Sequence, residues 1–388
     1  MNNIHKGLIL LIRSAITKEK MPLPDDFSLE EAYPLIKAHQ IANIVYEGAV
    51  YCGIPKNLPI MQKLFRLAYA CLLHSTRQLT ALSKLYAAFE KEGIDYMPMK
   101  GCNLKGLYPR PELRIMGDAD VLIRMEQYER IISIVMQLGY QRIKESGHEL
   151  VWDCADLHLE LHKCIVADHH VVAADYYGDG WRFAHKQEGT RYTMKPEDEL
   201  VYLFSHFTVH YREGGIGCRQ MLDIWVYLRS HPALDTAYLR SQLEKLELLK
   251  FYDNVCHTIQ VWFEDKKPDQ MSDYVSNVIF SNGSWGTQEQ RVVAKVSKNT
   301  GLNQVKTRRK KMLLWSIFPG LKRMQQIYPV LRKAPVLLPF LWVARWFTIL
   351  FTQKKRAFHW LKSYSAVTVE EVSDFQDGLH YVGLSHKH

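Results

Sequence analysis

The chain has 388 residues, of which 47% are hydrophobic and 23% are charged, a composition that excludes a disordered protein and allows two or three domains. Its seven cysteines form no CxxC pair, which argues against a disulfide framework or a zinc knuckle and favours a reducing cytoplasm. The formal charge is +9, but residues 301–388 alone carry 15 Lys and Arg against 4 Asp and Glu. The basic end of the chain therefore indicates a polyanionic partner or surface.

The N-terminal ninety residues are predicted to be mostly helical. A short apolar run at residues 8–12 is followed by Arg13 and by no small-residue cleavage site, which argues against a secretory signal. Between residues 59 and 92, apolar side chains recur at spacings of three and four, the period of an amphipathic helix that ends near Gly93. We therefore assign residues 1–92 to a helical N-terminal region.

The pattern then changes to alternating strands. Residues 94–99 form a short strand-like run, followed by a Lys-Gly turn, and residues 126–138 have the spacing of a helix. Three further segments alternate as half-buried strands do, the last two pairing across a short turn: residues 118–123, 148–153 and 156–162. This order predicts an α+β core, a mixed sheet with helices, over residues 93–190.

The remainder is again helical in pattern. Residues 191–280 form a third, helical region, and residues 281–388 form a fourth, which is basic and helical. Residues 280–310, rich first in Ser, Asn and Gly and then in Lys and Arg, are predicted to be a linker. The apolar segment at 334–351 contains Arg345 and two prolines, so a membrane span is disfavoured. A buried helix is the first interpretation, and an interfacial membrane helix is the second.

Acidic residues on two of the predicted strands indicate a site. Asp118 and Asp120 stand two apart, so both project from one face of their strand. The strict alternation of residues 156–162 places four polar side chains on one face and three leucines on the other: Asp156, His158, Glu160 and His162. Carboxylates that converge in this way can hold the divalent cations that phosphoryl and nucleotidyl transfer need. A solvated strand edge is the plain alternative.

Four ordered motifs carry a family resemblance. MKGCNLKGLYP at residues 99–109, LRIMGDADVLI at 113–123, GY at 139–140 and ELH at 160–162 resemble a bacterial family of largely uncharacterised nucleotidyltransferases of the DNA polymerase β-like superfamily. The resemblance implies a polymerase β-like core flanked by helical N- and C-terminal regions. It also implies Mg²⁺ or Mn²⁺ as cofactor and a nucleoside triphosphate as donor, whose nucleoside monophosphate passes to an acceptor hydroxyl.

The resemblance also assigns residues by position. Asp118 and Asp120 match the metal-binding pair, and Glu160 matches the third acid, which assists deprotonation of the acceptor. The residues implied in nucleotide contact are Lys100, Gly101, Cys102, Lys105, Arg114 and His162. An ordinary surface role is the alternative for Lys105. Arg219 and Asp223, four positions apart on a predicted helix, are expected to form an ion pair. Two departures stand out: a Lys-Gly turn replaces the superfamily's Gly-Ser, and the gap from Gly101 to Asp118, at 17 positions, is longer than usual. The lysine can meet a phosphate as a point charge, beside the backbone amides of Gly101 and Cys102.

Other functions stay open. A non-catalytic or regulatory member of the same fold would bind a nucleotide or a partner without turnover. A DxD glycosyltransferase would need an α/β nucleotide-binding domain where residues 1–93 are helical. A sugar or glycan is the favoured acceptor by analogy. We expect a cytoplasmic protein, peripheral at the inner face of the membrane if its basic C-terminal region binds anionic lipid. Relief of repulsion among the acids would make Asp120→Asn stabilising, on the order of 1 kcal/mol.

Overall fold

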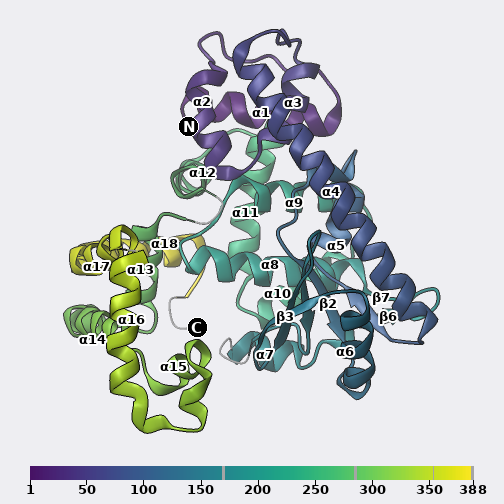
Figure 1. Ribbon diagram of the computed structural model, residues 1–388. Coiled ribbons are helices and arrows are strands. Elements are labelled where there is room, and N and C mark those ends of the chain that lie inside the picture. The colour runs from purple at the N-terminus through teal and green to yellow at the C-terminus, as the bar shows by residue number, and fades with distance from the viewer. Residues whose placement is uncertain (168–170, 284–285, 353, 386–388) are drawn as a thin grey trace. The chain divides into compact units, whose positions relative to one another are not determined.

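The computed structural model describes residues 1–388 apart from 168–170, 284–285, 353 and 386–388 (Figure 1). The chain divides into two compact units, each with a hydrophobic core of its own. Unit 1 consists of Met1–Thr208 and Ile216–Ser284, and unit 2 consists of Val209–Gly215 and Trp285–His388. The finer division into four regions at residues 92, 190 and 280 stays a prediction.

Unit 1 begins with four helices: α1 (Asn3–Thr17), α2 (Leu29–His39), α3 (Ala42–Tyr51) and α4 (Pro59–Lys91). The longest, α4, starts with a proline at its first turn and ends before Gly93, whose φ of +63° suits glycine. Its buried residues include Leu82, Leu85 and Phe89, which lie at the expected spacings of three and four. The helical N-terminal region is therefore confirmed.

A mixed five-stranded sheet forms the centre of unit 1. Its order is β1 (Tyr96–Pro98), β2 (Ala119–Ile123), β5 (His158–His162), β4 (Glu149–Asp153) and β3 (Gln141–Glu145). The central pair, β2 and β5, is parallel, and the other neighbouring pairs are antiparallel. The α+β fold is thereby confirmed. Strand β3 was outside the prediction, because all of its residues are exposed and no alternation marks it.

The two faces of the sheet differ in chemistry. Val121, Ile123, Leu159 and Leu161 are fully buried in a core shared with α6 (Tyr128–Gln137) and the C-terminal half of α4. Figure 1 shows both helices beside the sheet. Since successive side chains of a strand point to opposite faces, the polar residues of β2 and β5 all project from the other face. That face carries the site.

The rest of unit 1 consists of short helices and one hairpin. The turn after β1 contains α5 (Gly101–Leu104) and the 3₁₀ segments Lys105–Leu107 and Pro111–Leu113. The hairpin joins β6 (Ala184–Lys186) to β7 (Tyr192–Met194). The later helices are α7 (Val171–Tyr177), α8 (Pro196–Arg212), α9 (Cys218–Ser230), α10 (Thr236–Lys245), α11 (Leu249–Phe263) and α12 (Gln270–Asn282). The last turn of α8, from Val209, belongs to unit 2. The helical pattern expected after residue 195 is confirmed.

Unit 2 is a small helical body. Its helices are α13 (Gln288–Ser297), α14 (Val305–Ile317), α15 (Leu321–Ile327), α16 (Leu338–Thr352), α17 (Lys354–Ala366) and α18 (Val369–Val382). Val292, Val296, Val305, Tyr364 and Val372 form its core.

Two expectations from the sequence are wrong in unit 2. Residues 280–310 are not a linker, because α13 lies within them and buries Val292 and Val296 in the core. The segment 334–351 is not a buried helix, because α16 has no buried residue. Composition was a poor guide in both segments. In residues 280–310, polar residues cap and cover the helix α13. In residues 334–351, apolar residues stay exposed on α16.

Candidate functional site

The two acidic strands lie side by side at the centre of the sheet, with their acids opposite each other. Asp120 of β2 pairs in register with Glu160 of β5. Because the two strands are parallel and the pair is in register, both carboxylates project from the same face. This is the face that the sequence predicted for Glu160.

Asp120 is the centre of the site. It is only 2% exposed, and its Oδ1 accepts hydrogen bonds from Lys100 Nζ at 2.7 Å and from His162 Nε2 at 2.8 Å. Burial alone would raise the pKa of Asp120, but the Lys100 ammonium and the His162 imidazole outweigh it and lower that pKa well below its usual range. Asp120 is therefore ionised at neutral pH.

His162 links the two acidic strands. Its Nε2 lies 3.6 Å from the Glu160 carboxylate as well as 2.8 Å from Asp120. Burial favours the neutral imidazole, but the hydrogen bonds to Asp120 and Glu160 raise the pKa of His162 above its ordinary value. Its other ring nitrogen, Nδ1, is buried and has no hydrogen-bond partner among the residues that the structure describes.

Asp118 adds a third negative charge. Burial, and then the neighbouring charges of Asp120 and Glu160, raise the pKa of Asp118, although Lys100 opposes them. A carboxylate held in this way is stabilised by any cation that comes close. Asp118 therefore shares the electrostatic environment of the other two acids, as the DxD spacing predicts.

One group of side chains has the composition of a metal site. Ligand atoms of Asp120, Glu160 and His162 lie within 4.8 Å of one another, the one such group of three or more among the residues that the structure describes. Two carboxylates and an imidazole suit a hard or borderline divalent cation such as Mg²⁺ or Mn²⁺. Asp118 is not in this group, so its part in metal binding stays a prediction. The residues present fit the cofactor that the motifs imply.

The turn before α5 places Lys100 over the acids at the expense of backbone strain. Lys100 has φ +46° and ψ −119°, a conformation that glycine adopts easily and lysine rarely. Its side chain is nevertheless ordered by the ion pair with Asp120. Burial would lower the pKa of Lys100, but the charges of Asp120 and Tyr202 and the hydrogen bond to Asp120 raise it above its ordinary value. In this arrangement the ammonium contacts a carboxylate; its phosphate role stays a prediction.

Gly101 and Cys102 have different surroundings from those of an open phosphate cradle. A Cβ on Gly101 would lie 2.6 Å from Arg114 Nη1 and 2.9 Å from Met116 Cγ, so only glycine lets these side chains approach the turn. The Cys102 amide donates to the Met99 carbonyl at 3.0 Å and is not free for a phosphate. Burial, and then Asp120, raise the pKa of the Cys102 thiol to about 12, so it stays neutral.

Arg114 is held in place by a partner that the sequence did not suggest. Its Nε and Nη2 donate to the two carboxylate oxygens of Asp223 on α9, at 3.1 and 3.0 Å. Tyr108 donates to the same carboxylate at 2.6 Å. The sequence pattern favoured an ion pair between Arg219 and Asp223 one helical turn apart, but Asp223 is occupied by Arg114 instead.

Arg219 is consequently a half-buried cation beside another cation. Its Nη1 donates to the Ile115 carbonyl at 3.3 Å, and it has no ion pair in the described part of the chain. Burial, and then the Arg114 guanidinium, lower the pKa of Arg219, although Asp223 opposes them. Such a group would gain from an anionic ligand. Only the contact between α9 and the loop before β2 reveals it, and no sequence motif does.

Lys105 is not at the surface. It is 2% exposed, and its ammonium donates to the Arg114 carbonyl at 2.7 Å. Burial, and then the Arg114 charge, lower the pKa of Lys105 to about 8. The alternative of an ordinary surface lysine is wrong. Its ammonium supports the Arg114 backbone, and its predicted contact with a triphosphate remains untested.

Helix α8 brings further side chains close to the site. Asn103 of α5 donates to Glu199 at 2.8 Å, and Tyr227 of α9 donates to the same carboxylate at 3.3 Å. Burial of the Tyr202 phenol, one turn further along α8, raises its pKa above the ordinary value, although the nearby Lys100 opposes the shift. Asn103 and Glu199 are 96 positions apart in the sequence, and none of the motifs at residues 99–162 points to this contact.

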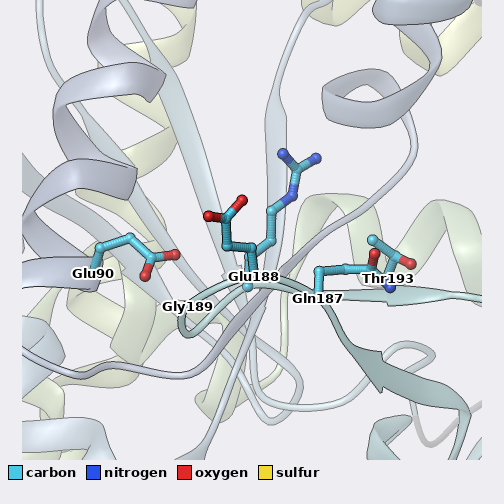
Figure 2. Close-up of a pocket in the computed structure, with 6 residues that line it drawn as sticks. Glu90, Gln187, Glu188, Gly189 and Thr193 are labelled. Carbon is cyan, nitrogen blue, oxygen red and sulfur yellow. The ribbon is translucent and has the colours of Figure 1, made fainter.

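A separate pocket lies at the edge of the sheet. It has a volume of about 770 Å³ and is lined by Glu90, Gln187, Glu188, Gly189, Arg191 and Thr193. Figure 2 shows the labelled side chains around the turn of the β6–β7 hairpin and the end of α4. Glu90 is engaged there, accepting from the Thr190 amide at 2.9 Å. None of the acids of β2 or β5 lines this pocket.

Comparison with known proteins gives one strong match. Residues 25–264 match the family model described as uncharacterised nucleotidyltransferase, and this range contains every residue of the site above. No curated protein matches the chain. A solved structure, titled as the solution structure of the antibiotic-resistance factor ANT(2'')-Ia, is similar over 49% of this chain and 98% of its own, with 17% identity and a TM-score of 0.33. So weak a likeness carries no argument. With the family match covering more than half of its length, the chain belongs to the uncharacterised nucleotidyltransferase family.

Proposed function

We propose that this chain is a metal-dependent enzyme that moves a nucleoside monophosphate from a nucleoside triphosphate to an acceptor hydroxyl. The observation that carries the proposal is the parallel pairing of Asp120 with Glu160, with Asp118 two positions before and His162 two positions after. Family membership supports nucleotidyl transfer in general. The metal, the donor and the acceptor are the finer parts of the proposal.

We assign a separate chemical role to each group of site residues. Asp118, Asp120, Glu160 and His162 would hold Mg²⁺ or Mn²⁺. The ion would supply charge neutralisation at the transferred phosphate. Glu160, whose side chain is 20% exposed and more open than Asp120, is placed to accept the proton of the acceptor hydroxyl.

Two cations beside the acids suit the triphosphate. Arg114 is fixed by its two hydrogen bonds to Asp223, and Arg219 is half-buried and has no ion pair with any residue that the structure describes. A planar guanidinium binds phosphate oxygens in pairs, which orients the donor as well as neutralising it. We add Arg219 to the predicted nucleotide contacts on this ground.

The test is pyrophosphate release from each of the four common nucleoside triphosphates with Mg²⁺ or Mn²⁺, with and without a mixture of sugars and cell metabolites. Only a nucleotidyltransferase is expected to release pyrophosphate and leave a labelled nucleoside monophosphate on an acceptor. Asp120→Asn and Glu160→Gln should each remove at least about a hundredfold of the rate, the size expected when a group acting in the transition state is lost. Asp153→Asn, a half-exposed carboxylate on β4, is the matched control and should keep the rate.

The alternatives predict different results. A non-catalytic member of the fold would bind nucleotide and Mn²⁺ without releasing pyrophosphate from any of them. A glycosyltransferase would release a nucleoside diphosphate from a sugar nucleotide. A sugar or glycan acceptor, the favoured class, would appear as a labelled, phosphatase-resistant sugar derivative in the metabolite mixture.

A further inference from the structure

Helix α16 of unit 2 carries an apolar face that is exposed to solvent. Phe340, Val343, Phe347, Leu350 and Phe351 recur at helical spacings and share this face. Phe340 is 72% exposed, Phe347 57% and Phe351 84%. Single exposed apolar residues are ordinary, but a contiguous row of three phenylalanines and two aliphatic residues marks a surface that meets a partner.

The opposite face fixes α16 to unit 2. The indole N–H groups of Trp342 and Trp346 donate to the carbonyl oxygens of Pro319, just after α14, and Ile317, its last residue, at 2.9 and 2.8 Å. Both rings pack edge-on against Phe318, and Arg345 between them donates to a third carbonyl oxygen at 3.3 Å. The helix therefore presents one face outward while the other is already occupied.

The part of unit 2 that contains α16 is strongly basic. Residues 301–362 contain 14 Lys and Arg and no Asp or Glu. On α14, Lys306, Lys310 and Lys311 are exposed, and the Lys311 ammonium lies 4.8 Å from the ring centre of Trp315, itself 52% exposed. Basic side chains beside exposed aromatic rings complement an anionic headgroup layer above an apolar interior.

We propose that unit 2 docks on the surface of an anionic lipid bilayer, inserting the phenylalanine face of α16 and setting the lysines of α14 among the headgroups. Two other occupants fit less well. A nucleic acid would use the charge but leave the phenylalanines in water. A second copy of this chain would cover the phenylalanines but bring two strongly basic surfaces together.

The geometry favours lying in the interface over crossing the bilayer. Among the described residues, Pro335–Thr352 is the one helical span long and apolar enough to cross a membrane. Crossing would carry Arg345 into the hydrocarbon and break the three contacts that Trp342, Arg345 and Trp346 make near the end of α14. An interfacial position keeps all three contacts and buries only the outer face.

The experiment uses the full chain and vesicle flotation. We compare neutral phosphatidylcholine vesicles with vesicles containing about 30% phosphatidylglycerol, at about 0.1 M and about 0.5 M salt, where screening lengths differ about twofold. We expect flotation with the anionic vesicles alone, weakened at high salt. One basic residue near an anionic surface contributes roughly fivefold in affinity, so Lys310→Gln/Lys311→Gln should weaken binding roughly 25-fold.

The phenylalanine variants test the apolar contribution to vesicle binding, which charge alone would not produce. Phe347→Ser/Phe351→Ser should weaken vesicle binding at least tenfold at unchanged net charge, because both side chains would otherwise leave water. Met136→Ser/Ile143→Ser, which alters two comparably exposed apolar residues of unit 1, is the matched control and should not weaken it. If the melting temperature of the first variant falls, Phe340→Ser, on the same face, takes its place.

Each of the following results would overturn the proposal. Equal flotation with neutral and anionic vesicles would remove the role of charge. Vesicle binding that is unchanged in the phenylalanine variants would point to a polyanion as the partner. So would binding to an RNA oligonucleotide without binding to vesicles. A dimer in sedimentation that dissociates on Phe347→Ser/Phe351→Ser would assign the face to a second copy. Protein that stays with the vesicles in alkaline carbonate would indicate a helix that spans the bilayer.

Discussion

The ion pair between Lys100 and Asp120 gives the sharpest prediction, made with Asp120→Asn. Lys100 Nζ and Asp120 Oδ1 are 2.7 Å apart, and the side chain of Lys100 is 14% exposed and that of Asp120 is 2% exposed. Removing one partner of a buried pair leaves the other charge without compensation and typically costs about 3–5 kcal/mol. His162 Nε2 then faces a neutral amide in place of a carboxylate. The sequence alone favoured a stabilising effect through relief of repulsion among the acids. The Lys100 ammonium reverses the expected sign.

A double-mutant cycle separates the pair from its surroundings. Lys100→Met and Asp120→Asn should each lower the free energy of unfolding by about 3 kcal/mol, which for a unit of this size is roughly 6 °C or more in melting temperature. The double variant has no uncompensated charge and should lose less than the sum, with a coupling energy of about 2–3 kcal/mol. Urea unfolding followed by circular dichroism measures each variant. Asp153→Asn, a half-exposed carboxylate, should change stability by less than about 1 kcal/mol.

Metal binding supplies a second readout of the same pair. In the native chain a cation at Asp120 has to displace the Lys100 ammonium, so Lys100→Met should bind Mn²⁺ more tightly in calorimetry and regain stability when Mn²⁺ is added. Asp120→Asn should bind it at least tenfold more weakly. Additive effects in the cycle, together with unchanged Mn²⁺ affinity in Lys100→Met, would refute the reasoning.

Three further predictions follow from neighbouring residues. The folded chain holds fewer protons on Lys105 than the unfolded chain between about pH 8 and about pH 10, so its free energy of unfolding should rise with pH there by up to about 3 kcal/mol, and Lys105→Met should abolish the rise. Arg219→Met should weaken nucleoside triphosphate binding at least tenfold without loss of stability, whereas Arg229→Met, exposed on the same helix, should change neither. Gly101→Ala should push Arg114 aside, costing about 1–3 kcal/mol in unfolding and weakening the same nucleotide binding.

Each of these has a contrary outcome. A stability of the native chain that is flat above pH 8 would mean that Lys105 keeps an ordinary pKa. Tight nucleotide binding by Arg219→Met, measured by fluorescence titration, would show that Arg219 does not contact the nucleotide. Full stability and full binding in Gly101→Ala would show that the contact between Gly101 and Arg114 is loose.

The local patterns of the core were sufficient to predict every strand of its sheet except β3, and the face that carries the acids. Alternation in residues 156–162 fixes which side chains share a face whatever the partner strand is, and DxD spacing does the same for β2. The parallel pairing of these two strands then follows only from the assembled sheet. Sequence spacing could not show that Asp120 stands opposite Glu160 rather than one pair further along.

What the sequence could not show is which charges neutralise which. Asp223 looked like a helix-surface partner of Arg219, yet the tertiary fold gives it to Arg114, 109 positions away. Lys100 was placed near a phosphate, and the fold turns it onto Asp120 through a backbone conformation that no propensity favours. On α16, high apolar content suggested burial, but the helix has no buried residue. Hydropathy describes how strongly a residue tends to leave water, and it does not show whether a core is present to bury that residue.

The chain order of the site residues has a consequence for how the protein is made. Lys100 is synthesised before Asp118 and Asp120 and leaves the ribosome ahead of them. Glu160, the acid opposite Asp120, follows 40 residues later. Asp223, which fixes Arg114, is available only after α9 has been synthesised. The central parallel strands cannot pair as a hairpin does, so their meeting waits on the whole intervening chain. A nascent chain that stops short of α9 thus carries its acids without the framework that orients them. The arrangement around Asp120 therefore becomes complete only as unit 1 closes.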